Sequence, residues 1–203
     1  MENRPVSRRI VIIQGHPDKA GQHFCHALAD AYAQSAEAAG HVVQRIEVAL
    51  LDFPLLRSKE EFYDGPAPAV LQPAQDAIAN ADHLVIIYPL WLGSMPALLR
   101  AFFEQTFRPR FAFELAIPSQ GLPKLTKRFK GKSARIIVTM RMPAFIYRWY
   151  YYAHGLKSLK RNILGFCGVA PIRESLIGSI EAPDDALRKK WLAKMTAFGR
   201  AGS

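Results

Sequence analysis

The stretch from Leu84 to Phe107 constrains the fold of this chain more than any other segment. Leu84 to Tyr88 are apolar without alternation, which is typical of a strand covered on both faces, and the run stops at Pro89. Apolar residues then recur at helical spacing from Leu98, shortly after Pro96, whose missing N–H costs little in a first helical turn. A buried strand therefore leads through a short loop into a helix, which predicts an α/β fold.

Four further segments have the apolar character of strands: residues 9–14, 41–48, 134–139 and 171–180. Segments with apolar residues at helical spacing alternate with them: residues 24–38, 70–81, 156–166 and 185–198. This alternation predicts a three-layer α/β sandwich, in which helices cover both faces of a five-stranded parallel sheet. Strand order 2-1-3-4-5 is the simplest doubly wound solution for five such strands.

The length of 203 residues suits a single domain, which we expect to span residues 8–203 after a flexible tail at 1–7. Residues 49–73 are predicted as a loop ordered by packing against another element, and 108–132 as a long connection. No apolar run reaches the roughly 18 residues of a membrane span, and no signal peptide precedes the first strand. These features predict a soluble, cytoplasmic protein.

The chain has two cysteines, Cys25 and Cys167, and a net charge of +10. Two cysteines are too few for a disulfide scaffold or a cysteine-only metal site, so we expect reduced thiols and no metal. The positive charge attracts anions of any kind, including nucleotide phosphates, nucleic acid and acidic membrane surfaces. Charge alone does not distinguish among these partners.

In a sheet of this order, ligands bind at the carboxyl ends of the strands, where the strand order reverses between the first and third strands. The loops expected there are residues 15–24, 89–94 and 140–147. The first has neither a GxGxxG nor a P-loop motif. It nevertheless precedes a helix, whose unpaired N–H groups, with His16, Lys19 or His23, would suit a phosphate. The alternative is a simple turn with solvated histidines.

Aromatic residues mark the other two loops. Trp91 and nearby backbone amides would suit the face and edge of a flat heteroaromatic ring, unless Trp91 simply packs in a structural turn. Tyr147 and His154 are seven residues apart, which is two turns of a helix, so both would face one pocket and stabilise developing negative charge. The alternative is that both are packing residues.

Several motifs resemble those of one family, the flavodoxin-like NAD(P)H:quinone oxidoreductases that include DT-diaphorase and relatives of modulator of drug activity B. The most specific match is the run from Tyr88-Pro89-Leu90-Trp91 through Met95-Pro96-Ala97-Leu98-Leu99 to Phe103-Glu104 and Phe107. Further matches are His16, Phe24-Cys25, Phe111-Ala112-Phe113, Tyr147 and His154, and Gly165-Phe166-Cys167-Gly168. The resemblance spans nearly all of residues 9–198.

The resemblance implies a flavodoxin-like sandwich that holds FAD or FMN noncovalently. It implies two-electron, ping-pong transfer, in which NAD(P)H delivers a hydride to the flavin and a quinone or similar acceptor then takes the electrons. The cofactor-binding residues would be His16, His23, Phe24, Cys25, Pro89, Leu90, Trp91, Leu92, Gly93, Thr139, Met140 and Arg141. Tyr147 and His154 would be catalytic, and Phe113 and Tyr151 would wall the substrate site. The family site usually forms across a homodimer.

The chain departs from the family pattern at three places: Trp91 lies one position early, Cys25 replaces an asparagine, and Met140-Arg141-Met142-Pro143 replaces a glycine-rich loop. An alternative function within the fold is a regulatory subunit of a potassium-efflux transporter, with a membrane protein as partner. Nucleic-acid binding through the basic segment 124–135 is a third hypothesis, which the lack of interleaved aromatics and motifs disfavours.

Overall fold

The computed structural model describes residues 7–116, 118, 122, 124–181 and 185–203. Most of the predicted tail, residues 1–6, therefore lies outside the described residues. One parallel sheet organises the chain, with β2 (Val42–Glu47), β1 (Arg9–Gln14), β3 (His83–Pro89), β6 (Ser133–Thr139) and β7 (Ile172–Ile177) in that order. This confirms the predicted arrangement of five strands as 2-1-3-4-5.

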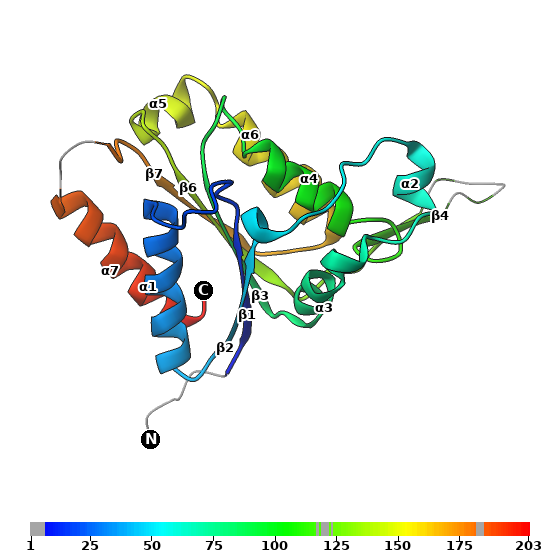
Figure 1. The fold of residues 1–203 in the computed structure, drawn as a ribbon, viewed down its shortest axis with the longest axis horizontal. Coiled ribbons are helices and arrows are strands. Elements are labelled where there is room, and N and C mark those ends of the chain that lie inside the picture. The colour runs from blue at the N-terminus through cyan, green and yellow to red at the C-terminus, as the bar shows by residue number, and fades with distance from the viewer. Residues whose placement is uncertain (1–6, 117, 119–121, 123, 182–184) are drawn as a thin grey trace.

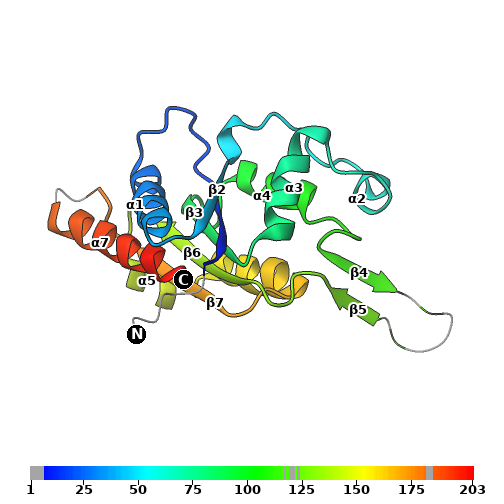
Figure 2. The ribbon, with the colours of Figure 1, turned by 90° about the horizontal axis from the view of Figure 1, so that it is seen from below.

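Helices cover both faces of this sheet, as Figures 1 and 2 show. On one face lie α1 (Phe24–Ala38) and α7 (Asp185–Ala201), which pack against each other. On the other lie α3 (Gln72–Asn80), α4 (Ala97–Thr106) and the π-helical segment η3 (Ser158–Gly165). The predicted three-layer sandwich is confirmed.

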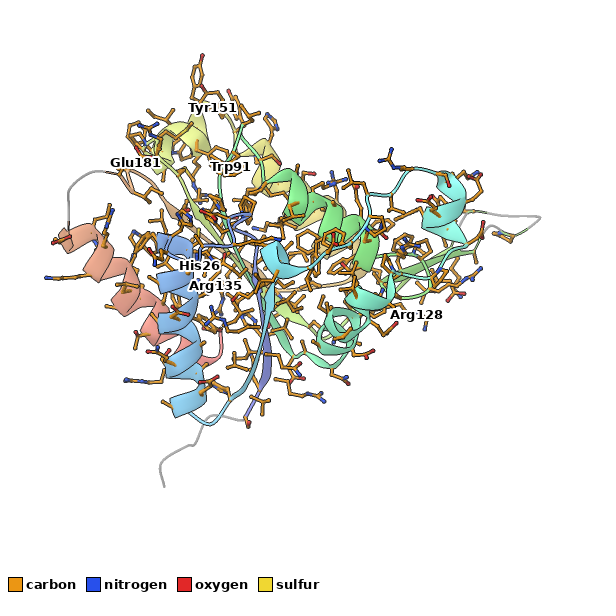
Figure 3. All side chains as sticks on the ribbon, viewed as in Figure 1. His26, Trp91, Arg128, Arg135, Tyr151 and Glu181 are labelled. Carbon is orange, nitrogen blue, oxygen red and sulfur yellow. The ribbon has the colours of Figure 1, made fainter. Side chains whose placement is uncertain are left out.

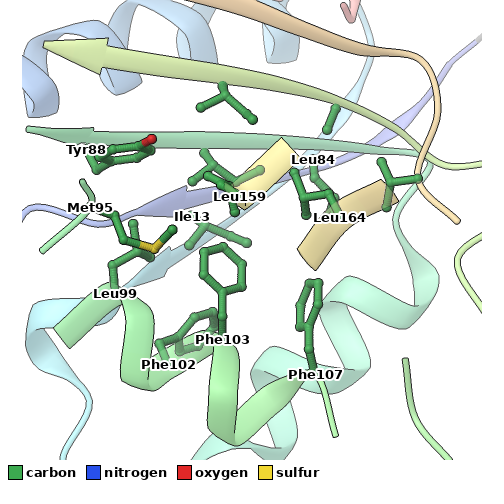
Figure 4. Packing of buried hydrophobic residues seen from close by; sticks show 14 of the residues in the cluster. Ile13, Leu84, Tyr88, Met95, Leu99, Phe102, Phe103, Phe107, Leu159 and Leu164 are labelled. Atoms are coloured by element: carbon green, nitrogen blue, oxygen red, sulfur yellow. The ribbon is translucent and has the colours of Figure 1, made fainter. Parts of the chain in front are cut away.

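Two hydrophobic clusters fill the spaces between the layers, because successive strand side chains point to opposite faces. Ile10 and Ile12 pack toward α1 and α7, whereas Val11 and Ile13 pack toward α4. The larger cluster carries the aromatic stripe of the Leu84 to Phe107 stretch, with Tyr88 from β3 and the phenylalanines of α4 in contact range of η3 (Figure 4). This packing fixes where β3 ends and α4 begins.

The segment between β2 and α3 is more ordered than a plain loop, with η1 (Val48–Leu50), α2 (Lys59–Tyr63) and η2 (Ala69–Leu71). Arg108, which is buried, donates to the carbonyl oxygens of Glu61, Gly65 and Pro66 at 2.5, 3.0 and 2.9 Å. Gln105 Nε2 also donates to Pro54 O at 2.6 Å, and Phe53 packs on Phe102, so the guanidinium is one of several contacts with the α4 region that order this segment.

The connection at 108–132 contains an antiparallel hairpin that the sequence did not predict, β4 (Phe113–Ala116) and β5 (Lys124–Lys127). It projects from the main sheet (Figure 2), and most of its residues are exposed. An exposed two-stranded ribbon lacks the unbroken apolar run that identifies a buried strand, which is why the pattern was missed.

The segment after β6, expected to begin as a loop over residues 140–147, instead contains two short helices. Helix α5 (Ala144–Trp149) ends before α6 (His154–Lys157), and Tyr152 and Ala153 between them have left-handed φ angles of 53° and 48°. Ala153 N–H donates to the carbonyl oxygen of Tyr147 at 3.0 Å, which closes the turn. The chain therefore reverses its course within the aromatic run.

The two edge strands of the sheet carry charged residues held in ion pairs. On β2, Arg45 pairs with Asp30 at 2.5 Å and with Glu47 at 3.1 Å. On β7, Glu174 pairs with Arg148 at 2.8 Å and with Lys160 at 3.2 Å. Across the described ranges, we find no helix with the length and apolar character needed to cross a membrane.

Candidate functional site

The loops after β1, β3 and β6 meet at the carboxyl edge of the sheet, where the strand order reverses between β1 and β3. The shared hydrogen-bond ladder places them there: Gly15 N–H donates to Ile87 O at 2.7 Å, and Leu90 N–H donates to Thr139 O at 2.8 Å. The three predicted loops therefore lie side by side.

Two histidines of the first loop stack on each other. The rings of His16 and His23 lie 3.8 Å apart and nearly parallel, and His26 approaches them from the first turn of α1, with its ring 5.5 Å from that of His16. His23 Nε2 lies 2.6 Å from an Asp18 carboxylate oxygen, and Asp18 N–H donates to His16 Nδ1 at 3.2 Å. Sequence reasoning missed His26, although its position three residues after His23 places both on one helical face.

Burial lowers the pKa values of two of these histidines, His16 and His26. Desolvation by burial, together with the charges of His23 and His26, lowers the pKa of His16 to about 4. Burial likewise lowers the pKa of His26. His16 is thus neutral at pH 7, and its Nδ1, which accepts a backbone hydrogen bond, leaves Nε2 as the proton-bearing nitrogen.

The N-terminus of α1 has neither a side-chain cap nor an acidic residue to offset the helix dipole. Its N-cap residue, His23, makes no side-chain capping bond, and its first turn has no acidic residue. Within the described part of the chain, the amides of Gln22, His23 and Phe24 donate to no protein acceptor. Gln14 Nε2 and His26 Nδ1 are also buried nearby without partners. Unpaired donors at a helix N-terminus suit an anion such as a phosphate.

The second loop is a tight turn with reciprocal bonds. Trp91 N–H donates to Ser94 O and Ser94 N–H to Trp91 O, both at 2.9 Å. Leu92 and Gly93 between them have φ angles of 47° and 76°, as in a type I′ turn. In the described residues, the amides of Leu92 and Gly93 donate to no protein group, and the Trp91 side chain is half exposed (Figure 3). The turn therefore presents two free donors beside an accessible indole.

The third loop is held against the second by close backbone packing. A Cβ atom on Gly155 would overlap Gly93 O and would lie 2.7 Å from Ser94 Cα. The buried Tyr147 hydroxyl donates to Gly93 O at 3.3 Å and accepts from Leu156 N–H at 3.1 Å. Loops two and three are thus fixed relative to each other by α5 and α6.

Arg141, at the start of the third loop, points away from the sheet. Its side chain is 81% exposed, and its Nε lies 2.6 Å from Glu181 Oε2, in the segment after β7. This partner could not be predicted from local sequence, because 40 residues separate Arg141 from Glu181. The guanidinium is therefore held at the surface by this carboxylate.

Several predicted cofactor-binding residues lie in the core beneath the loops. Pro89 is the last residue of β3, and Met140 follows β6. Cys25 Sγ lies 3.2 Å from the Thr139 hydroxyl, and burial raises the pKa of the Cys25 thiol to about 11. Phe24 and Leu90 are half-buried at the same edge. Cys25 is therefore an unreactive thiol that fastens α1 to β6.

The predicted catalytic and substrate residues are not all brought together. Because the chain turns between α5 and α6, Tyr147 and His154 do not share one helix: Tyr147 is buried, and His154 is exposed beside the Tyr152 ring. Tyr151 is exposed on the same side as Trp91 in Figure 3. Phe113 packs on Phe166 at 4.9 Å, near the far end of α4.

The fold agrees with comparisons to known proteins. A family model described as a flavodoxin-like fold matches residues 8–197. A curated protein of Haemophilus influenzae, named an uncharacterized NAD(P)H oxidoreductase, is 26% identical over 201 residues, covering 93% of this chain and 96% of that protein. The structure of Smu.1420 from Streptococcus mutans matches with 27% identity and a TM-score of 0.77, covering 94% of this chain and 98% of the other.

A second similar structure is an NAD(P)H:quinone oxidoreductase from Methanothermobacter marburgensis, with 21% identity and a TM-score of 0.77. The match covers 96% of each chain. At this level of identity the likeness concerns the fold alone.

Proposed function

Because the chain belongs to the family with the flavodoxin-like fold, we propose that it is a flavin-dependent NAD(P)H oxidoreductase that reduces quinones or similar acceptors by two-electron transfer. The observation that carries the proposal is the pairing, at one sheet edge, of an uncapped helix N-terminus with a turn that offers two free amides beside Trp91. These suit the phosphate and the ring of one flavin. The name of the H. influenzae relative supports the activity.

The phosphate would lie over the first turn of α1. The unpaired amides there, Gln14 Nε2 and the proton-bearing Nε2 of His16 supply neutral donors, and the positive end of the helix dipole adds attraction. His23 and Phe24 would border this position. Cys25 would contribute through its backbone amide and by its contact with Thr139, since its thiol is buried.

The ring would lie against the second and third loops. Leu92 and Gly93 would donate their free amides to its edge, and Trp91 would cover its face. Since Arg141 extends outward to Glu181, the family's glycine-rich loop is not needed to leave room for the ring. The guanidinium instead stands at the rim, where it would meet a negatively charged portion of the cofactor or of NAD(P)H.

A bound flavin accepts a hydride from NAD(P)H and passes two electrons to the acceptor; the protein binds, orients and handles protons. We assign proton handling to His154, whose exposed imidazole lies at the start of α6. Tyr147 acts as a positioning residue, because its hydroxyl holds the Gly93 carbonyl and thereby the orientation of the free amides. This assignment separates two residues that the sequence suggested would work side by side.

A homodimer is the proposed assembly. Exposed aromatic side chains cluster beside the site: Phe145, Trp149, Tyr150, Tyr151 and Tyr152, with exposed fractions of 49–74%. An apolar surface of this kind is typical of an interface. In such a dimer Tyr151 would wall the acceptor pocket, and Phe113, which lies away from Trp91 in its own chain, would serve the site of the other copy.

The purified protein is expected to be yellow, or to become so with FMN or FAD, with the visible absorbance of an oxidised flavin. NADPH or NADH should bleach this absorbance and a quinone should restore it. Mass spectrometry of the molecule released on heating would distinguish FMN from FAD. Protein that stays colourless after incubation with both flavins would contradict the proposal.

Flavin binding is expected to depend on pH through His16. The free protein holds His16 neutral down to about pH 4, and a bound phosphate favours its protonated form, so the complex binds more protons. Affinity therefore rises as the pH falls from 7.5 to 5.5. Because the second pKa of a phosphate monoester is also near 6, the comparison must be made with His16→Gln, in which only the phosphate titrates.

Fluorescence titration with FMN at both pH values would measure this difference. The ratio of wild-type to His16→Gln affinity should grow several-fold toward pH 5.5, on the order of one charge-assisted hydrogen bond. If the ratio of wild-type to His16→Gln affinity is the same at both pH values, His16 does not contact the phosphate.

A further inference from the structure

A cavity lies at the edge of the sheet opposite the candidate site, where the strands begin. Its volume is about 330 Å³, at the small end of the range for ligand sites. Arg8 precedes β1, His83 opens β3, Ser133 opens β6 and Arg173 is the second residue of β7, and all four line it. Parallel pairing brings these starts together, with His83 opposite Ser133 in the ladder.

Positive charge surrounds this cavity. Arg8 and Arg173 line it, and Arg135 lies close enough to perturb the same histidine. Arg8 donates one hydrogen bond to Gly202 O at 2.8 Å, so most of its five N–H groups remain for another acceptor. Among the described residues, no Asp or Glu side chain lines the cavity, and none pairs with Arg173.

Other contacts hold the surroundings in place. Arg135 donates to Ser203 O at 2.8 Å and to the Ser175 hydroxyl at 3.2 Å, and its guanidinium stacks on Phe198 at 3.5 Å. The nearby carboxylate, Asp82, accepts from Arg9 N–H at 2.8 Å and pairs with the Arg9 side chain at 3.4 Å. Arg8, at the cavity wall, and Arg135, behind it, therefore have backbone and hydroxyl partners, with no carboxylate side chain among them.

His83 supplies the observation that points to a ligand. His83 is only 2% exposed, and its Nδ1 lies 2.8 Å from the Ser133 hydroxyl. Its Nε2 is buried and has no hydrogen-bond partner among the described residues. A buried polar atom without a partner is uncommon in folded proteins, because its lost hydration is not replaced. Burial and the charges of Arg8, Arg135 and Arg173 lower the pKa of His83 to about 3. Burial contributes most to this lowering, and the arginine charges that add to it would also attract an anion.

We propose that this cavity binds a phosphoryl group, held by the guanidinium groups of Arg8 and Arg173 and by the imidazole and hydroxyl of His83 and Ser133. Guanidinium forks match the geometry of phosphate oxygens, and Ser133 can donate to the ligand or to His83. The site is separate from the proposed flavin site, because it lies at the other ends of the same strands. It does not depend on the proposed function.

The test uses inorganic phosphate and glycerol 3-phosphate as probes on the full chain, with sodium chloride at matched ionic strength as the reference. Binding should shift the ring resonances of His83 in ¹⁵N-detected NMR spectra and raise its pKa, because the bound anion favours the imidazolium. Resonances of His16, followed in the same spectra, report any binding at α1. The thermal midpoint should rise with phosphate concentration more than with chloride.

The variant Arg173→Gln removes one guanidinium at an exposed position of β7 and should weaken phosphate binding about tenfold, the effect expected for a charge-assisted pair. Ser133→Ala provides a second variant with a smaller change of volume. Arg161→Gln, at an exposed position of η3 outside the cavity lining, is the matched control and should bind like the wild type.

Tighter binding of glycerol 3-phosphate would identify a phosphate monoester as the preferred form of the ligand, and tighter binding of inorganic phosphate would identify the free ion. Either result supports the site if His83 responds and Arg173→Gln weakens it. Unshifted His83 resonances with both probes, or equal weakening by Arg161→Gln, would overturn the proposal.

Discussion

Replacing Arg108 by alanine is expected to lower the free energy of unfolding by about 3 kcal/mol, among the largest single effects in this chain. The buried guanidinium binds the carbonyl oxygens of Glu61, Gly65 and Pro66, and its other nitrogens bond to Gln105. Without it these acceptors lose their donor and the segment from β2 to α3 loses its anchor. For a chain of this length, the midpoint of thermal unfolding should fall by about 6–12 °C.

Limited proteolysis is the second measurement for Arg108→Ala, because the released segment should be cut within residues 54–68 before the rest of the chain. Arg108→Lys keeps the positive charge but loses the planar guanidinium with its several donors. Its thermal midpoint should therefore lie between those of the alanine variant and the wild type. Arg57→Ala, an exposed arginine in the same segment, is the matched control. A midpoint for Arg108→Ala within 1 °C of that control would show that the segment is ordered by other contacts.

Replacing Gly155 by alanine is expected to weaken flavin binding by at least about tenfold, because it separates the two loops that would meet the ring. The added methyl group would overlap Gly93 O and crowd Ser94 Cα, and both are backbone atoms that cannot move by a change of rotamer. The turn that presents the free amides of Leu92 and Gly93 must then shift. Overpacking of this kind also lowers stability, by about 1–3 kcal/mol.

Flavin titration and thermal unfolding of the same Gly155→Ala sample would separate the two effects. Lys157→Ala, at an exposed position of the same short helix, should leave both quantities close to the wild type. If Gly155→Ala is destabilised yet binds flavin with wild-type affinity, the second loop is not part of the cofactor site. If neither quantity changes, the two loops are not held by this contact.

The centre of the main sheet could be predicted from sequence because β1, β3 and β6 are buried on both faces, so that Leu84 to Tyr88 and similar runs stand out. The hairpin β4–β5 could not, since its strands are short and mostly exposed. Nor could the break between α5 and α6, because the left-handed angles of Tyr152 and Ala153 contradict what their side chains favour. Tertiary contacts overrode local preference there.

The site was predictable to the same extent. The positions of Trp91, His16 and His23 follow from loops at the carboxyl edge of a wound sheet, whereas the stacking of the two histidines was not predicted. The outward turn of Arg141 depends on Glu181, a partner far away in sequence, and the division of Tyr147 from His154 depends on a backbone reversal. Such pairings are set by the folded chain, and residue types alone do not specify them.

The ion pairs on the outer strands also bear on how copies of this chain can meet. An open sheet offers a row of unpaired backbone groups at each margin, onto which a neighbouring sheet can grow. Here Arg45 on β2 and Glu174 on β7 are tied to helices or loops of their own chain, so a docking strand would have to strip those charges of their partners. Continuous cross-chain sheets, and the fibrous aggregates that arise from them, are therefore disfavoured at both margins.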